Sequence, residues 1–268
     1  MPLPTFSEEW KKHGTHLAEY GSEFLGTAFY LVCVIGLVAV FSAPHSFIAS
    51  SIPSIPLRLL FIGLLSGGAI YLVAISPLGR LSGAHLDPAV SLGFWMIGKM
   101  HFRDMLGYIG SQFAGGIVGV LSGHALFGNL AQDVKDAVLH PGLHIGGLEA
   151  FLGEILTTFV LVFFVLTFVS HKVLERWTAL MIVFLIPILV LLDASISGSG
   201  INPARWLGPA LFHNFWQLWW VYLFGPFLGS MLAVGLRRTH LIGPVTPRTG
   251  KINHDSRYRS LFKHDIIS

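Results

Sequence analysis

SGAHLDPAVSLG at Ser82–Gly93 and SGSGINPARWLG at Ser197–Gly208 are two copies of one segment, identical at six of twelve positions and 115 residues apart. Each copy contains an Asx-Pro-Ala triplet: Asp87, Pro88 and Ala89 in the first, and Asn202, Pro203 and Ala204 in the second. Asx side chains cap helix N-termini, and proline is favoured at the first helical position. Each copy therefore predicts the start of a helix.

The two predicted helices, 87–97 and 202–212, are too short to cross a bilayer, because a spanning helix needs about 20 apolar residues. Both lie in a strongly apolar background. Backbone that breaks at membrane depth is tolerated where protein covers it or where it lines a water-filled cavity. Two such half-helices therefore indicate a pathway through a membrane protein.

The composition agrees with a membrane protein, since 53% of the residues are hydrophobic, only 12% are charged and the mean hydropathy is +0.68. Six further stretches are long enough to span a bilayer. They are 18–42, 57–78, 104–127, 148–170, 177–196 and 216–236. The expected fold class is an all-α membrane protein with six transmembrane helices plus two re-entrant half-helices.

The repeat extends beyond the triplets, because EFLGT at Glu23–Thr27 in the first span is matched by EILTT at Glu154–Thr158 in the fourth. Each half has three spans, so the second half enters the membrane inverted relative to the first, and the half-helix tips meet near the middle. The predicted organisation is an N-terminal segment 1–17, a first repeat 18–127, a connecting loop 128–147, a second repeat 148–238 and a C-terminal tail 239–268.

Basic residues set the expected orientation, because cytoplasmic loops are enriched in lysine and arginine. Fourteen of the 17 lie in the termini or in the loops on the same side. Both termini and the tail are therefore expected to be cytoplasmic, and the loop 128–147 extracellular. The basic tail is expected to be a mobile segment that contacts anionic lipid headgroups, and the sequence gives no support for a gating role.

Glu23 and Glu154 are carboxylates inside spans, where ionisable groups are costly and usually face the interior. We expect each to accept hydrogen bonds from the irregular backbone before a half-helix. A proton relay is the alternative, and the duplicated position favours scaffold support.

The two Asx-Pro-Ala triplets, the arginine after the second and the paired glutamates make residues 18–238 resemble the aquaporin and aquaglyceroporin family, the major intrinsic proteins. The resemblance implies inverted repeats, a homotetramer with one pore per subunit, and permeation of water and small neutral solutes. It also implies a pore centre at the two triplets, where Asn202 donates and the positive ends of both half-helix dipoles oppose cations.

By this resemblance the narrowest point of the pore falls on Gly67, Val190, Ser199 and Arg205. Only Arg205 is large, so a wide filter is expected, open to glycerol, urea, ammonia, hydrogen peroxide or metalloid acids. Gly67 is counted back from Asp87 without a gap. Trp206 and Ala210 depart from the pattern of glycerol channels.

Asp87 stands where the family usually has asparagine. An ionised carboxylate accepts but does not donate, so the pore centre loses a donor; a neutral carboxyl would still donate. The helix end favours the ionised form and burial opposes it, which leaves the choice open. One reading is a simple cap; the other is altered selectivity or pH-dependent flux. His85, a possible pH modulator, is otherwise a loop histidine bonded to backbone.

An ion-conducting channel or coupled transporter using Asp87 is the alternative function, and a structural protein with a closed pore is a third. No nucleophile–base pair, metal-ligand spacing or phosphoryl-transfer motif supports an enzyme, a cofactor or a metal site. The net charge of +3 gives no reason to expect a nucleic-acid partner. The expected location is a prokaryotic inner membrane.

Overall fold

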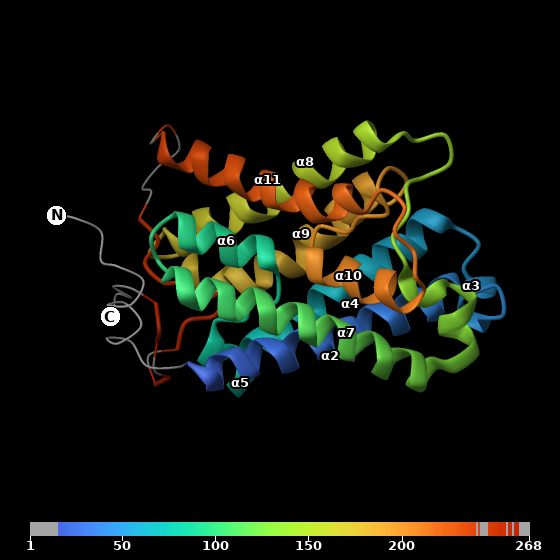
Figure 1. Ribbon diagram of the computed structural model, residues 1–268, viewed down its shortest axis with the longest axis horizontal. Helices are drawn as coiled ribbons and strands as arrows, with labels where there is room; N and C mark the ends of the chain where they lie inside the picture. The colour runs from blue at the N-terminus through green and yellow to red at the C-terminus, as the bar shows by residue number, and fades with distance from the viewer. Residues whose placement is uncertain (1–15, 240, 242–245, 256, 259, 263–268) are drawn as a thin grey trace.

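The structure is a computed structural model that describes residues 16–239, 241, 246–255, 257–258 and 260–262. Among these residues six helices are long and apolar enough to cross a membrane, and they run along the long axis of the molecule (Figure 1). They are α2 (Leu17–Ser42), α4 (Ile55–Ile75), α7 (Phe102–Asp133), α8 (Gly147–Val169), α9 (Thr178–Asp193), preceded by η2 (Glu175–Trp177), and α11 (Trp219–Arg238). The predicted all-α class is confirmed; the predicted N-terminal segment lies almost wholly outside the described residues.

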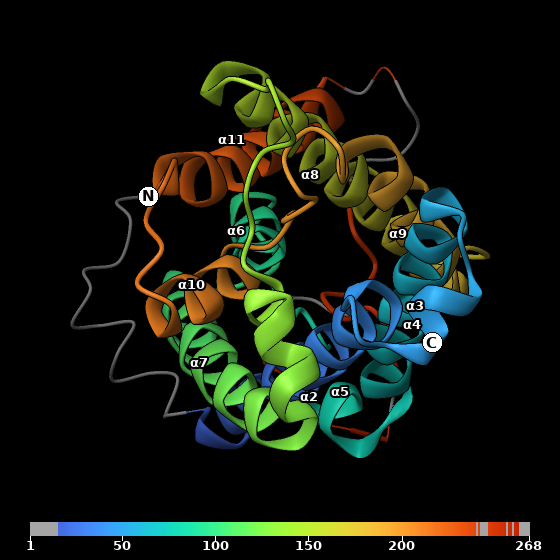
Figure 2. The same ribbon diagram turned by 90° about the vertical axis from the view of Figure 1, so that its right-hand side faces the viewer.

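Two short helices, α6 (Pro88–Met96) and α10 (Pro203–Phe212), begin at the prolines of the two triplets. Figure 1 shows them end to end in the middle of the bundle, and Figure 2 shows α10 between α7 and α11, with α6 nearer the centre. The remaining short elements are α3 (Phe47–Ser51), α5 (Pro77–Ser82) and η1 (Lys135–Ala137). The half-helices therefore reach the interior of the bundle without crossing it.

Glycines allow the long helices to pack closely, and the two halves do so in the same way. A Cβ atom at Gly115 of α7 would overlap the carbonyl oxygen of Phe24 in α2. A Cβ atom at Gly229 of α11 would overlap the carbonyl oxygen of Ile155 in α8. Small residues at such contacts let helix backbones approach within lipid, where packing drives association.

Among the helix boundaries that differ from the predicted ones, two have a backbone reason. The third span was expected to end at 127, but α7 continues to Asp133 across Gly128, whose φ of 49° and ψ of −123° bend the chain. The first part of the expected loop 128–147 is therefore a helical turn, followed by η1. The sixth span was expected from 216, but α11 starts at Trp219 because Leu218 has a left-handed φ of 51°.

The residues after α11 do not follow the expectation of a mobile tail. The amide of Ile252 donates to the carbonyl of Gly83 at 2.9 Å, and the side-chain amide of Asn253 donates to the carbonyl of Ala74 at 3.2 Å. Residues 246–255 thus lie against α5 and the end of α4. The expectation is corrected for the described part of the tail, because backbone carbonyls at this end of the bundle accept its donors.

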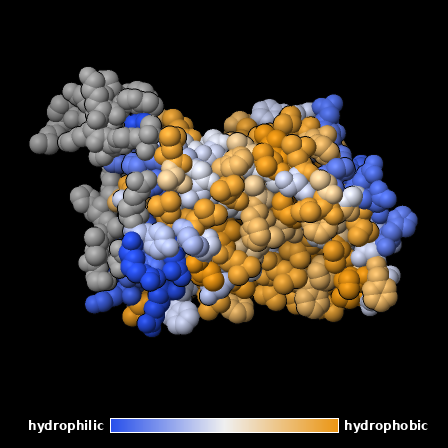
Figure 3. Space-filling view, turned by 90° about the horizontal axis from the view of Figure 1, so that it is seen from below, coloured by the Kyte–Doolittle hydropathy of each residue, from blue (hydrophilic) through white to orange (hydrophobic). Residues whose placement is uncertain are grey.

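The surface divides by hydropathy along the same axis. Figure 3 shows hydrophobic residues across the middle of one face and hydrophilic residues gathered toward its two ends. Around the whole molecule, exposed large apolar side chains include Leu25, Leu65, Leu156 and Phe184, from α2, α4, α8 and α9. This distribution fits helices that meet lipid along their length and water at both ends.

Candidate functional site

A cavity of about 510 Å³ lies between the long helices and reaches the tips of both half-helices. Much of its wall is aliphatic, formed by residues of α2, α4, α8 and α9 such as Val34, Ile62, Leu161 and Ile186. Its polar side chains include Tyr30, Ser66, Asp87, Ser199, Asn202 and Arg205. A mostly apolar cavity with a few polar groups is the usual form of a small-molecule site.

Both Asx residues cap their half-helices. Asp87 has an extended φ of −148°, and one of its carboxylate oxygens accepts from the amide of Ala89 at 2.8 Å. The side-chain oxygen of Asn202 accepts from the amides of Ala204 at 2.8 Å and Arg205 at 3.3 Å. Pro88, Ala89, Pro203 and Ala204 are buried, and Asp87 and Asn202 line the cavity. The positive ends of both helices therefore point at the cavity centre.

Glu23 of α2 is fully buried and holds the loop before α6. Its two carboxylate oxygens accept from the amides of His85 at 3.1 Å and Leu86 at 2.7 Å. The hydroxyl of Ser82 and the side-chain amide of Gln112 donate to the same carboxylate, each at 2.7 Å. Ala84 and Leu86 have φ of 56° and 54°, a region that costs non-glycine residues free energy. The carboxylate therefore stabilises a strained loop.

Glu154 of α8 makes the equivalent contacts in the second half. It accepts from the amides of Gly200 and Ile201, each at 2.7 Å, and from the hydroxyl of Ser197 at 2.6 Å. Ser199 and Ile201 repeat the left-handed φ values, at 57° and 60°. The carboxylate of Asp193, at the end of α9, also accepts from the Ser197 hydroxyl, at 2.5 Å. Both glutamates lie where scaffold support requires them.

The two halves differ at the carbonyls that precede the caps. The side-chain amide of Asn202 donates across the centre to the carbonyl of Leu86 at 2.8 Å. The equivalent carbonyl, that of Ile201, accepts from the hydroxyl of Thr158 at 3.2 Å. One amide hydrogen of Asn202 is therefore used within the protein and the other remains for the cavity.

Of the four side chains assigned to the narrowest point, Val190, Ser199 and Arg205 line the cavity and Gly67 does not. A Cβ atom at Gly67 would lie 2.8 Å from the Cα atom of Val183, so Gly67 faces the backbone of α9. Gly63 faces Pro187 in the same way. The count back from Asp87 placed Gly67 in the pore, and the structure corrects it.

The register between α4 and α9 shows which residue takes the place of Gly67. Gly67 is opposite Val183, seven residues and about 10 Å along α9 from Val190. Ile62 precedes Gly63, lines the cavity and lies within one turn of the depth of Val190. The cavity-lining stripe on α4 is Leu59, Ile62, Ser66 and Ile70. This spacing of three and four residues is a helical signal that the sequence contains, but the apolar background of α4 hides it.

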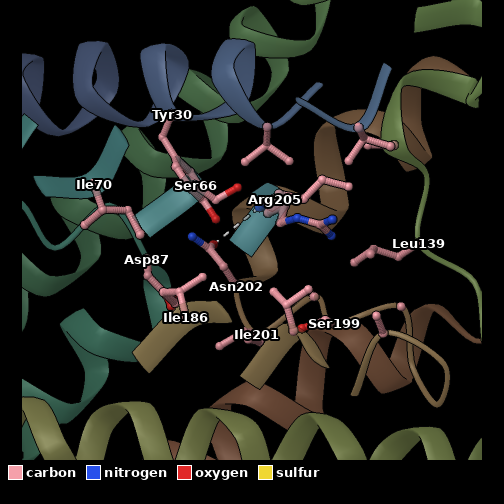
Figure 4. Close-up of a pocket in the computed structure, with 18 of the residues that line it drawn as sticks. Tyr30, Ser66, Ile70, Asp87, Leu139, Ile186, Ser199, Ile201, Asn202 and Arg205 are labelled. Atoms are coloured by element: carbon pink, nitrogen blue, oxygen red, sulfur yellow. Dashed lines mark hydrogen bonds between the residues drawn. The ribbon is translucent and has the colours of Figure 1, made fainter. Parts of the chain in front are cut away.

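The short helix α5 accounts for the error. It places six residues, Pro77–Ser82, between the end of α4 at Ile75 and the loop before Asp87. The count from Asp87 to Gly67 ran through this helix as if it continued the span. Figure 4 shows Tyr30 and Ser66 on one side of Asn202, with Arg205 extending toward Leu139.

His85 is buried and lines the cavity beside the first half-helix. Its Nε2 lies 2.9 Å from the carbonyl oxygen of Gly250, and its Nδ1 lies 3.1 Å from the hydroxyl of Ser91. The backbone contact expected of a loop histidine is therefore present, but the backbone belongs to the tail. Sequence reasoning missed this, together with Tyr30 and Ile252 in the cavity wall.

A model of the major intrinsic protein family matches residues 9–236. The chain belongs to that family. It is 34% identical over 171 residues to the probable aquaporin AqpM of Archaeoglobus fulgidus, which covers 60% of this chain and 69% of the relative. It is 33% identical over 190 residues to a probable glycerol uptake facilitator protein of Thermotoga maritima, covering 65% of this chain and 79% of the relative.

The fold also agrees with this family. A solved structure of the aquaglyceroporin from Plasmodium falciparum matches with a TM-score of 0.66 and 23% identity, over 82% of this chain and 94% of that one. This family member is therefore a multi-pass integral membrane channel of the type that conducts water or glycerol-like solutes, and not an enzyme. In the described residues no group of three or more His, Cys, Asp or Glu side chains is placed to hold a metal ion.

Proposed function

We propose that this chain is a passive channel for water and small uncharged solutes, and that the cavity between the half-helix tips is its permeation path. One observation carries the proposal: a single cavity is lined by both caps, Asp87 and Asn202, and by Arg205. Two half-helix dipoles at the centre and the guanidinium of Arg205 in the same cavity then oppose cations, while neutral molecules meet no comparable barrier.

The proposed selectivity filter consists of Ile62, Val190, Ser199 and Arg205. Two of the four side chains are aliphatic, so a solute can pass the filter while forming few hydrogen bonds. The isoleucine makes this filter narrower than the glycine assignment predicted. Glycerol, urea, ammonia, hydrogen peroxide and neutral metalloid acids remain the proposed solutes, because each is uncharged and presents hydroxyl, amine or carbonyl groups to Ser199 and Arg205.

The test is stopped-flow light scattering on proteoliposomes, with an impermeant osmolyte for water and with glycerol and urea gradients for solutes. Ile62→Trp is expected to reduce glycerol and urea entry more than water entry, because it adds bulk at the filter. Leu65→Trp is the matched control, since Leu65 lies on the same helix but is 46% exposed on the outer surface. The proposal fails if neither the wild type nor any variant makes vesicles shrink faster than empty ones.

An ion-conducting channel that uses Asp87 gives a different result. Planar-bilayer currents carried by sodium, potassium or protons through the wild-type protein, and lost in Asp87→Asn, would replace the neutral channel with that alternative. Asparagine keeps the cap and removes the carboxylate. The neutral channel predicts no current in either protein.

We further propose a homotetramer in a prokaryotic inner membrane with both termini in the cytoplasm. The support is the exposed apolar surface of the long helices and the family's pattern of one pore per subunit. The concentration of basic residues at the end that holds Arg80, Arg176 and Arg237 supports the orientation. Native mass spectrometry tests the subunit number, and protease access to Arg257 in oriented vesicles tests the side.

A further inference from the structure

The C-terminal segment, meaning residues 246–255, 257–258 and 260–262, binds the end of the bundle where α4 and α8 stop. The amide of Arg248 donates to the carbonyl of Val169 at 2.7 Å, and the ammonium of Lys251 donates to the carbonyl of Arg80 at 2.8 Å. Ile252 and Asn253 add the bonds to Gly83 and Ala74 described above. Four residues between 248 and 253 are thus bonded to α8, α5, the first loop and α4.

Burial shows that this contact is more than a surface association. Lys251 is 0% exposed, Ile252 is 2% exposed and Phe262 is 5% exposed. A buried lysine is costly unless its ammonium has partners, and here a backbone carbonyl accepts from it. Ion pairs flank the contact: Arg248 with Glu175 at 2.9 Å and Arg80 with Asp255 at 3.1 Å.

The segment also reaches the cavity itself. Ile252 is one of the residues that line it. Phe262 packs against His85, with ring centroids 5.4 Å apart, and against Phe94 and Tyr108 at 6.4 Å each. The carbonyl of Gly250 only accepts, so the Nε2 of His85 donates to it. The segment and the first half-helix loop therefore form one packed unit at this end.

The two ends of the cavity differ in exposure. At the end away from the C-terminal segment the lining includes the exposed residues Asp133, Lys135 and His140. At the near end the lining includes Ile252 with Val165 and Ile182, which are 1% and 2% exposed. The cavity thus opens to the surface at one end and finishes against buried aliphatic side chains at the other.

We propose that the C-terminal segment is a built-in gate, and that this structure is its closed state. In the closed state Ile252 and the backbone on either side of it occupy the inner mouth, and Phe262 holds the segment on His85. Displacement of the segment opens the mouth while the half-helices and the filter stay in place. The inference rests on the proposed function, since it takes the cavity as the permeation path.

The first measurement is osmotic water permeability per reconstituted channel for the full-length protein and for the double variant Ile252→Ala/Phe262→Ala. If the open state is populated at about 10% or less, releasing the segment raises the permeability by about tenfold or more. Thr246→Ala is the matched control, because Thr246 belongs to the same segment and is exposed. It is expected to leave the permeability unchanged.

The second measurement, limited trypsin digestion, reports on docking without any flux. Arg257, whose side chain is 75% exposed, is expected to be cleaved in the wild type, while the buried Lys251 is protected. In the double variant cleavage after Lys251 is expected to become as fast as cleavage after Arg257. Equal cleavage at both sites in the wild type would overturn the docked gate.

The two readouts separate this inference from the proposed function. A conducting wild type whose permeability does not rise in the double variant, although Lys251 becomes accessible, overturns the gate alone. Absence of water flux in both proteins, with Lys251 accessible in the variant, overturns the proposed function and the gate with it. A rise in permeability together with Lys251 cleavage supports both.

Discussion

The side-chain amide of Asn202 donates to the backbone carbonyl of Leu86 at 2.8 Å, so the cap of the second half-helix is tied to the loop that precedes the first. The reverse bond, from position 87 to the carbonyl of Ile201, is not available to an ionised aspartate, because a carboxylate has no hydrogen to donate. The hydroxyl of Thr158 donates to that carbonyl instead, at 3.2 Å. The equivalent carbonyls of Leu86 and Ile201 therefore accept from different donors, a side-chain amide and a hydroxyl.

This asymmetry predicts coupling between Thr158 and Asp87. Thr158→Val removes the only side-chain donor described at the Ile201 carbonyl and is expected to cost about 1–3 kcal/mol of stability. In an Asp87→Asn background the new amide reaches the same carbonyl, as Asn202 reaches Leu86, and the cost of Thr158→Val is expected to fall below about 1 kcal/mol. Thermal unfolding of the four proteins in detergent measures the double-mutant cycle.

Additive effects of the two substitutions would contradict the proposed exchange of donors. Thr157→Val is the control, because the hydroxyl of Thr157 donates to the carbonyl of Gly153 within α8. Its cost is expected to be the same in both backgrounds.

Loss of Glu154 is expected to be strongly destabilising. Glu154→Ala leaves the buried amides of Gly200 and Ile201 without their acceptor, at about 1–3 kcal/mol for each. Glu154→Gln keeps one oxygen acceptor and is expected to cost about half as much by the same principle. Glu149→Ala is the control on the same helix, since Glu149 is exposed. Equal melting temperatures for the Glu154→Ala and Glu149→Ala variants would show that the carboxylate is not needed to hold the loop.

The sequence predicted the features that repeat and missed those that depend on register. Glu23 and Glu154 were identifiable because a charged residue inside a span needs partners, and an unpaired loop at the same depth supplies them. The capping positions were identifiable because Asx-Pro has a local meaning. No residue pattern marks how deep in the membrane each residue of α4 lies. The count that ignored helix α5 therefore assigned Gly67 to the filter instead of Ile62.

The docked C-terminal segment was missed for another physical reason. Its sequence is polar and basic, which by composition indicates solvent or lipid headgroups. Its binding depends on backbone carbonyls of Gly83, Arg80 and Ala74, and on the ring of His85, none of which a composition reveals. Only the folded end of the bundle presents these acceptors together.

Gly67 and its neighbour Gly68 are expected to respond oppositely to alanine. In Gly67→Ala the new Cβ atom meets the backbone of Val183 at 2.8 Å, which forces α4 and α9 apart, so stability falls by about 1–3 kcal/mol. In Gly68→Ala the Cβ atom has nothing within 4 Å, and the gain in helix propensity is about 0.5–1 kcal/mol. Melting temperatures in detergent give the comparison, and an unchanged glycerol-to-water permeability ratio in Gly68→Ala confirms an intact filter.

If Gly67→Ala left stability unchanged and lowered the glycerol-to-water permeability ratio, Gly67 would belong to the filter after all. The contact with Val183 predicts the opposite, a loss of folded protein without a change in the ratio of the remaining channels.

Gly128 has space for a Cβ atom, but its backbone conformation is unfavourable for alanine. Its φ of 49° and ψ of −123° bend α7 so that the following turn carries Asp133 and Lys135 to the open end of the cavity. Gly128→Ala introduces no contact within 4 Å, so its expected cost of about 1–3 kcal/mol is backbone strain alone. Gly110→Ala, on the same helix and equally free of contacts, has ordinary helical geometry and is expected to be neutral or stabilising.

The same substitution is expected to act on the open mouth of the channel. If alanine straightens α7, the turn that carries Lys135 moves away from the cavity, and solute permeability changes while the filter residues remain in place. Stopped-flow permeability and melting temperature, measured together on the Gly128→Ala and Gly110→Ala proteins, separate the two effects. Equal stability for the two variants would show that the bend at Gly128 carries no strain for alanine, and that packing of the turn, not the glycine, sets the shape of the mouth.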